Sequence, residues 1–140
     1  MQEYSRLVGI DVGKKRIGIA QTDLLQTIAS PVGTFSPEEV FPHLKKITEQ
    51  SAVEKFIVGW PLMPDGSEGS SIDMVKEFIK KLENEFPGIP VHKADERNTS
   101  TKAMRLMIEA GVSKKKRREK ERVDRIAAAV ILQNYLDEIY

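Results

Sequence analysis

Residues 6–22 read RLVGIDVGKKRIGIAQT, and this stretch decides how the chain begins to fold. Its two halves, Arg6–Val12 and Arg16–Thr22, are short runs rich in β-branched residues, and Gly13-Lys14-Lys15 joins them. Two such runs around a glycine-containing turn predict a β-hairpin. The run Gln26–Phe35 that follows predicts a third strand, and its Pro31 indicates an edge strand or a bulge. The chain is therefore expected to open with a three-stranded antiparallel meander.

Helices and strands alternate through the rest of the chain. Ser36-Pro37-Glu38-Glu39 has an N-cap residue, a proline at the first helical position and acids in the first turn, which is typical of a helix start. Lys55–Trp60 is a nearly continuous apolar run, as expected of a strand buried on both faces. The remaining expected elements are a helix from the Ser-rich stretch after Pro64-Asp65-Gly66 to Phe86, a second central strand Ile89–Ala94, and helices Thr99–Ala110 and Val123–Glu138.

This order of elements predicts an α/β fold. A hairpin-rich half and a parallel crossover half are expected to share one five-stranded mixed sheet, in which three strands form the antiparallel meander and two are parallel, with helices on the faces. With 140 residues, the chain is expected to form one domain, residues 1–140. Functional groups in such a sheet gather at the carboxyl ends of the strands.

The composition excludes several kinds of chemistry. There is no cysteine, so cysteine nucleophiles, thiolate zinc sites and iron–sulfur clusters are ruled out, and a reducing compartment is favoured. The amino terminus has no signal-peptide pattern, and the longest apolar run, residues 126–132, is far shorter than the ~20 residues that span a bilayer. We therefore expect a cytoplasmic protein without a membrane partner.

Positive charge is concentrated near the carboxyl terminus. Although the net charge of the chain is +1, residues 113–125 contain eight basic and three acidic side chains. A solvated helix face is the ordinary interpretation of such a run. Only two of the ten residues 114–123 are acidic and five consecutive ones are basic, which is poor for ion pairing within a helix and favours phosphate contacts instead, so nucleic acid is an expected partner. These five residues are Lys114, Lys115, Lys116, Arg117 and Arg118.

Asp11 is the first of three acidic positions at the ends of predicted elements. The two-residue period of a strand places it on the face of Leu7 and Gly9, opposite the strand's other apolar side chains. An ionised group after an apolar strand is costly unless something neutralises it. Gly13, two residues later, permits a close backbone approach.

The other two acidic positions come from distant parts of the chain. Asp95-Glu96 follows the predicted strand Ile89–Ala94, and only one of these two acids can share a face with the core residues before it. Asp124 lies near the start of the last predicted helix, where helical geometry aligns it with small residues that let the helix lie close to the sheet. Carboxylates that converge in one crevice are most easily explained by divalent cations. Two such cations support phosphodiester hydrolysis.

Each acid also has an ordinary interpretation. Asp11 could end a strand in a turn, Asp124 could favour the helix dipole, and Glu96 could pair with Arg97. Asp95 could replace Glu96, and the sequence leaves that choice open. Among other candidates, Asp23 is interpreted as a turn residue and Trp60 as a packing residue. His43 and His92 are too far apart in the pattern to form a metal pair and are interpreted as a helix-surface residue and a strand residue that faces a helix.

Four motifs together resemble one known family. They are Gly9–Ala20 (GIDVGKKRIGIA), Ile57–Leu62 (IVGWPL) with Asp65-Gly66-Ser67, Asp95-Glu96-Arg97 with Thr99 and Ala103, and Val123–Ala128 (VDRIAA) with Ile131-Leu132-Gln133. In this order, over almost the whole chain, they closely resemble the YqgF (RuvX) family. The first motif alone is weak, because actin-like ATPases and sugar kinases open similarly. Trp60 departs from the family pattern, where an aliphatic residue is more usual.

The resemblance implies an RNase H-like nuclease domain in a bacterial cytoplasm. It implies that Asp11, Glu96 and Asp124 are the catalytic acids that bind Mg²⁺ or Mn²⁺ in a two-metal site. The favoured activity is endonucleolytic hydrolysis of phosphodiester bonds in 5′-end processing of pre-16S rRNA. Alternatives are a Holliday junction resolvase on branched DNA and a non-catalytic RNA-binding ribosome assembly factor. A resolvase needs two active sites and hence a homodimer, whereas the sequence itself permits a monomer or a homodimer.

The nucleic-acid backbone is expected to contact basic residues beside the acids. These residues are Lys14, Arg16, Arg97 and the stretch Lys114–Arg118. A lysine-rich surface of this kind reads phosphates rather than base sequence. Selectivity is therefore expected to come from the shape of the RNA or of the junction.

Overall fold

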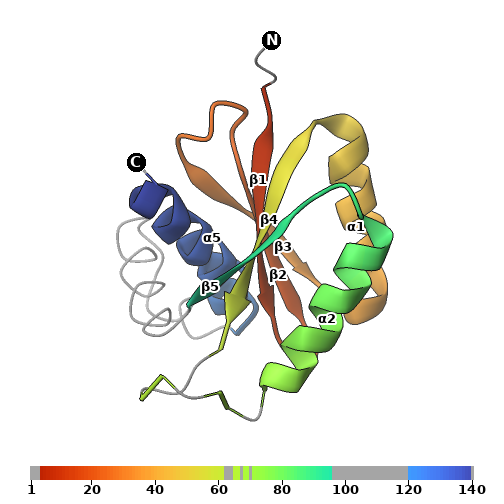
Figure 1. The fold of residues 1–140 in the computed structure, drawn as a ribbon, viewed down its shortest axis with the longest axis vertical. Helices are drawn as coiled ribbons and strands as arrows, with labels where there is room; N and C mark the ends of the chain where they lie inside the picture. Colours follow the sequence, from red (N-terminus) through yellow and green to blue (C-terminus); the bar gives the residue numbers. More distant parts are fainter. Residues whose placement is uncertain (1–3, 62–64, 67, 70, 96–119, 140) are drawn as a thin grey trace.

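The computed structural model describes residues 4–61, 65–66, 68–69, 71–95 and 120–139 of the chain, without the side chains of residues 120–125 and 139. The predicted helix Thr99–Ala110 lies outside these residues. Figure 1 shows a central sheet with α1 and α2 on one side and α5 on the other. No helix of the described part is long and apolar enough to cross a membrane.

The sheet has five strands in the order β3-β2-β1-β4-β5. Neighbouring pairs among β1, β2 and β3 are antiparallel, whereas β4 is parallel to both β1 and β5. The predicted mixed sheet, with a three-stranded meander and two parallel strands, is therefore confirmed. The bounds of the strands are β1 Arg6–Val12, β2 Ile17–Thr22, β3 Ala29–Phe35, β4 Val53–Trp60 and β5 Val91–Asp95.

Three helices of the described part cover the sheet: α1 Pro37–Gln50, α2 Ile72–Glu85 and α5 Lys120–Ile139. The predicted start of α1 is confirmed by a complete capping box. The Ser36 side chain accepts a hydrogen bond from the Glu39 backbone N–H, and the Glu39 side chain accepts one from the Ser36 backbone N–H. Such reciprocal bonds satisfy two amide groups that a helix start would otherwise leave unpaired.

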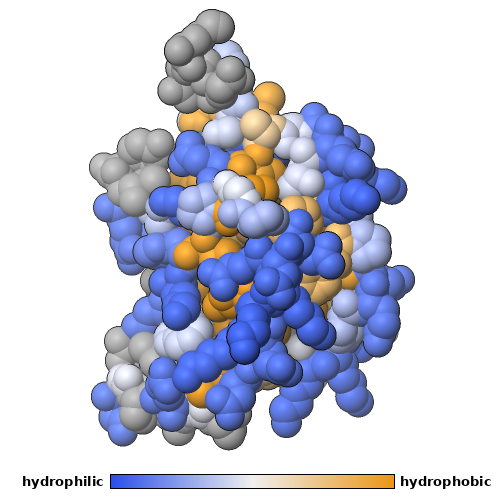
Figure 2. Space-filling view, turned by 45° about the vertical axis from the view of Figure 1, so that its right-hand side comes forward, coloured by the Kyte–Doolittle hydropathy of each residue, from blue (hydrophilic) through white to orange (hydrophobic). Residues whose placement is uncertain are grey.

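Side chains on the two faces of the sheet form two separate cores. Phe56 belongs to the larger core, between the sheet and helices α1 and α2. Leu7, Ile57 and Leu132 belong to the smaller core, between the sheet and α5. Hydrophilic residues dominate the view in Figure 2, and hydrophobic residues show in a band between them. Because the central strands β1, β2 and β4 each carry a run of buried residues, their register is fixed.

Two predicted strands needed correction. β3 begins at Ala29 rather than Gln26, because the residues before it form a hydrogen-bonded loop around Asp23. β5 is an edge strand rather than a central one, and it begins at Val91 rather than Ile89. The expectation for Pro31 is confirmed, since β3 is the opposite edge strand and its pairing with β2 shifts register beside Pro31.

Candidate nuclease site

Asp11 lies in β1 near the carboxyl edge of the sheet, where it is half-buried. β1 and β4 are parallel, and so are β4 and β5, so the carboxyl ends of these three strands meet at one edge. In β2 the partner of Asp11 is Gly18, which contributes no side chain beside the carboxylate. A carboxylate at this position faces the crevice in which α/β sheets usually bind ligands.

The face on which Asp11 lies is the one covered by α5. Its strand neighbours on that face are Leu7, which packs in the smaller core, and Gly9, which lies against α5. Val8 and Ile10, which alternate with them, pack in the core on the other side. The face predicted for Asp11 from the two-residue period is therefore the α5 face.

α5 approaches this face very closely at Gly9. A Cβ atom on Gly9 would lie 2.8 Å from the Cβ of Leu132 and 3.0 Å from the carbonyl oxygen of Ala128. Only glycine fits such a contact without a shift of the helix. The close approach of the last helix to the sheet, expected from its small residues, is thus confirmed.

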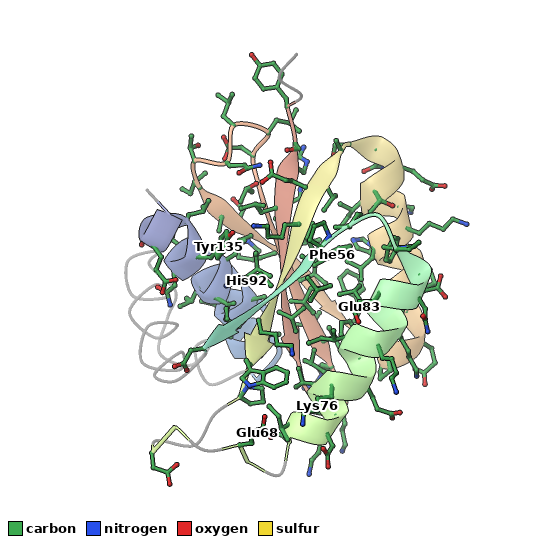
Figure 3. The ribbon with its side chains drawn as sticks, in the orientation of Figure 1. Phe56, Glu68, Lys76, Glu83, His92 and Tyr135 are labelled. Atoms are coloured by element: carbon green, nitrogen blue, oxygen red, sulfur yellow. The ribbon has the colours of Figure 1, made fainter. Side chains whose placement is uncertain are left out.

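Asp95 ends β5 on the opposite face from Asp11. The strand residues that flank it in the alternation settle this. Ala94 packs against the α5 core, and the His92 ring contacts the ring of Tyr135 in α5, with centroids 4.8 Å apart and an angle of 57° between the planes. Figure 3 labels both side chains, which lie side by side. Val91 and Lys93 lie on the other side, because Val91 packs against the larger core. Asp95 shares their face and points away from the face of Asp11.

The turn after Asp11 is tight and holds two exposed lysines. The Gly13 N–H donates to the carbonyl oxygen of Arg16 over 3.0 Å, and a Cβ on Gly13 would lie 2.6 Å from that oxygen. Glycine is therefore required here. Lys14 and Lys15 are exposed at this turn, and Arg16 is half-buried. The predicted phosphate contacts Lys14 and Arg16 thus lie at the same edge of the sheet as Asp11.

Several predicted site residues lie outside the described part of the chain. They are Glu96, Arg97 and Lys114–Arg118, and the side chain of Asp124 also lies outside it. Asp124 itself is in the first turns of α5. The residues three, four and seven positions later, Ala127, Ala128 and Ile131, are buried. Among the side chains that the structure describes, there is no group of three or more His, Asp or Glu residues that could hold a metal ion.

Asp23 lies at the far edge of the sheet, where β2 ends beside the start of β1. Thr22, the residue before it, accepts a hydrogen bond from the Leu7 backbone N–H. The Asp23 carboxylate accepts hydrogen bonds from the backbone N–H groups of Thr27 and Ile28 and from the Thr27 hydroxyl. These bonds, that of Ile28 first, lower the pKa of Asp23 from 3.8 to about 2. Its interpretation as a turn residue is confirmed.

Trp60 is a packing residue, as predicted, and it also positions a cation. It packs against the larger core, while the ammonium of Lys93 lies 4.5 Å from the centre of its ring. Sequence reasoning missed Lys93, because the contact depends on how β4 and β5 pair. A cation at this distance from an indole ring is held by electrostatic attraction.

Two histidines are explained by packing. His43 stacks on Phe35 with ring centroids 4.2 Å apart, and burial together with the charge of Lys46 lowers its pKa. His92 faces α5, as predicted, through its contact with Tyr135. Sequence reasoning missed a second contact of Tyr135. The Lys55 ammonium donates a hydrogen bond of 2.8 Å to the Tyr135 hydroxyl.

Comparison with known proteins decides the family. The family described as "RuvX: Holliday junction resolvase" matches residues 5–138. The chain belongs to the RuvX family. A relative from Chlorobium phaeobacteroides is 44% identical over 132 residues, 94% of this chain and 92% of its own. A relative from Salinibacter ruber is 41% identical over 137 residues, 98% and 96% of the two chains. Both are named "Putative pre-16S rRNA nuclease".

Solved structures agree with RuvX membership at the level of the fold. T. thermophilus RuvC in complex with a Holliday junction substrate is similar with a TM-score of 0.58 at 15% identity, over 96% of each chain. The large terminase nuclease of phage G20c is similar with a TM-score of 0.50 at 14% identity, over 91% of this chain and 84% of that one. The RNase H-like fold expected for the RuvX chain is therefore confirmed, and the family assignment is that of a nuclease, a hydrolase.

Proposed function

We propose that this RuvX protein is a divalent-metal-dependent endonuclease, and that its substrate is precursor rRNA in the cytoplasm. The position of Asp11 carries the proposal. Its carboxylate lies at the carboxyl edge of β1, on the sheet face that α5 covers, beside a turn that presents Lys14. The names of the relatives support a nuclease of pre-16S rRNA.

The donors at this site suit Mg²⁺ or Mn²⁺. Carboxylate oxygens are the hard ligands that these cations prefer, and Asp11 supplies them next to Gly18, which contributes no side chain. Asp11, Glu96 and Asp124 would hold the cations. Cations bound there would supply the Lewis acidity that phosphodiester hydrolysis needs. The protein must hold three carboxylates close together. In the absence of the cations this arrangement is unfavourable, because the negative charges repel one another.

The sheet face on which Asp95 lies favours Glu96 over Asp95 as the second acid. Asp95 lies on the face of Lys93 and Trp60, opposite to Asp11. A ligand set that includes Asp11 therefore excludes Asp95, and Glu96 is the neighbouring carboxylate. The third acid is Asp124. Ala127, Ala128 and Ile131, which follow it by three, four and seven positions in α5, are buried. This spacing supports its inclusion.

Lysine and arginine residues at the same edge would hold the nucleic-acid backbone. Lys14 is exposed on the tight turn, and Arg16 ends that turn. Arg97 and Lys114–Arg118 are assigned the same role from the sequence. Their positive charge neutralises phosphates, so binding depends on salt and not on base sequence.

Cleavage of branched DNA is the second candidate. The family description names Holliday junction resolvases, and the RuvC structure contains a junction substrate. A resolvase of this kind would act as a homodimer with two active sites, whereas an rRNA nuclease can act as a monomer. The molar mass in solution together with substrate choice therefore separates the two candidates.

The test is cleavage of matched RNA and DNA substrates, linear and branched, with Mg²⁺ or Mn²⁺. The proposal predicts metal-dependent cleavage, with RNA cut in preference to DNA. Asp11→Asn is expected to abolish cleavage and to leave binding intact or tighter, because it removes an anion that faces a polyanion. Equal cleavage by the wild type and this variant would refute the mechanism, and binding without any metal-dependent cleavage would indicate an RNA-binding assembly factor instead.

A further inference from the structure

A cavity of about 280 Å³ opens beside the turn that follows Asp11. It lies between this turn, the first turns of α1 and one side of α2, on the opposite face of the sheet from α5. Val12 and Ile17 line it from β1 and β2, and Phe41 and Phe78 line it from the two helices. Its volume lies just below the roughly 300–1,000 Å³ of typical small-molecule sites, so it suits one planar ring system.

The inner wall of the cavity is apolar and aromatic. Phe41 and Phe78 contact each other with ring centroids 5.2 Å apart and an angle of 35° between their planes. Phe78 is buried, whereas Phe41 and Met74 are only half-buried and remain partly accessible. An accessible phenyl ring in an apolar cavity is a stacking surface for a nucleobase, and every base has a face that can stack.

The rim of the cavity is charged. Lys14 from the turn and Lys81 from α2 line its mouth, and all of Lys14, Lys81 and Glu77 are exposed. Within the described ranges, neither ammonium forms an ion pair with a carboxylate. Both ammonium groups are on exposed side chains that can reach phosphates. Glu77 adds a carboxylate that can accept hydrogen bonds from the exocyclic amino group of a base.

The cavity lies next to the proposed catalytic edge, so one nucleic-acid strand could contact both. Val12, Gly13 and Lys14 line the cavity and follow Asp11 directly, while the side chain of Asp11 lies on the other face of the same strand. A nucleic-acid strand with a phosphate at Asp11 would cross the turn at Lys14 before it reached the cavity. A base can enter only if it is not paired, because the bases of a duplex are stacked inside it.

We propose that this cavity binds one unpaired nucleobase of the substrate strand, next to the bond that is cut, while Lys14 and Lys81 bind the phosphates on either side of it. The inference rests on the proposed nuclease function and adds a preference for substrates with a single-stranded segment at the cleavage site. A free nucleotide carries the same base and phosphate chemistry, so the test must compare the two sources.

The first experiment follows the methyl group of Met74 by NMR in the protein with ¹³C-labelled methionine. The chain has five methionines, and Met74→Leu assigns the resonance. A short single-stranded RNA is expected to shift the Met74 resonance, whereas the same sequence in a perfect duplex should not. Adenosine 5′-monophosphate is expected to bind far more weakly than the RNA. A bound single strand that leaves Met74 unshifted, or a mononucleotide that binds as tightly as the RNA, would overturn the proposal.

The second experiment measures affinity in variants. Phe41→Leu keeps an apolar side chain but removes the stacking ring, and we expect about tenfold weaker binding of the single strand with duplex binding unchanged. Lys81→Ala should weaken single-strand binding and flatten its salt dependence, whereas Lys80→Ala, its exposed neighbour outside the cavity, should do neither. Equal losses for Lys81→Ala and Lys80→Ala would contradict the proposal. Thermal unfolding of Phe41→Leu checks that the variant is folded.

The two proposals can fail separately. A shift of Met74 by single-stranded RNA without any metal-dependent cleavage would refute the nuclease function but keep the base-binding cavity. Metal-dependent cleavage that Phe41→Leu and Lys81→Ala leave unchanged, with no shift of Met74, would refute the cavity and keep the nuclease.

Discussion

Asp11, one residue before the end of β1, and Asp95, the last residue of β5, lie at the same edge of the sheet but on opposite faces of it. Asp11 shares a face with Leu7 and Gly9, against α5, whereas Asp95 shares a face with Val91, against the core under α1 and α2. The sequence leaves open which member of the pair Asp95-Glu96 joins Asp11. Because the two residues lie on opposite faces, we infer that Asp95 does not join Asp11. Asp95→Asn is therefore the control variant for the proposed metal site.

Gly9→Ala should destabilise the protein by about 1–3 kcal/mol, as overpacked cores do. The added Cβ would lie 2.8 Å from the Cβ of Leu132 and 3.0 Å from a backbone oxygen of α5, so the helix must move. The free energy of unfolding from urea titration measures the change. Gly88→Ala is the matched control, because a Cβ there has no neighbour within 4 Å among the described atoms. An equal loss of stability in both variants would contradict this account of how α5 packs.

The sequence predicts which face of β1 Gly9 lies on, but it does not predict the loop around Asp23. Alternation of apolar residues in β1 indicates two faces from the sequence alone, and the capping box of Ser36 and Glu39 marks the start of α1 without tertiary information. Gln26, by contrast, has a left-handed backbone (φ 56°), and its side chain donates hydrogen bonds to Ser5 and Glu54. Those partners are distant in sequence, so the run Gln26–Phe35 gives no sign that β3 begins three residues late.

In the candidate site too, features set by local sequence were predictable, whereas contacts between distant elements were not. The face and edge of Asp11 follow from one strand and its turn. The ring contact between Lys93 and Trp60, and the hydrogen bond between Lys55 and Tyr135, depend on pairing between elements tens of residues apart. Local patterns carry no information about such pairs. The edge position of β5 was missed for a similar reason, because the order of strands in a sheet is a tertiary property.

Asp23→Asn should lower stability at neutral pH but not in acid. Hydrogen bonds from Ile28 and Thr27 lower the pKa of Asp23 to about 2 in the folded protein, against 3.8 ordinarily. The charged form therefore stabilises the fold above pH 4, and this contribution is lost as the pH falls from about 4 to about 2. The difference in melting temperature between wild type and variant, measured at pH 7 and at pH 2, should shrink toward zero. A difference that stays constant across this range would show that the charge is not what stabilises the loop.

Neutralising Lys114–Arg118 together should weaken nucleic-acid binding and flatten its dependence on salt. Each lost phosphate contact changes the slope of log K against log salt by about 0.7–0.9. Fluorescence anisotropy with a labelled RNA at several salt concentrations gives that slope. Lys45→Ala with Lys46→Ala, two exposed lysines of α1, should leave the slope unchanged. If both sets of substitutions change it equally, the basic stretch is not a specific contact surface.

Calorimetric titration with Mn²⁺ tests the central claim most directly, because it measures cation binding without a substrate. The wild type and Asp95→Asn are expected to bind Mn²⁺ with similar affinity, while Asp11→Asn, Glu96→Gln and Asp124→Asn are each expected to bind it at least about tenfold more weakly. Circular dichroism of each variant confirms that it is folded. Unchanged Mn²⁺ binding in folded Asp11→Asn, or binding that Asp95→Asn abolishes and Glu96→Gln retains, would contradict a metal site built on Asp11, Glu96 and Asp124.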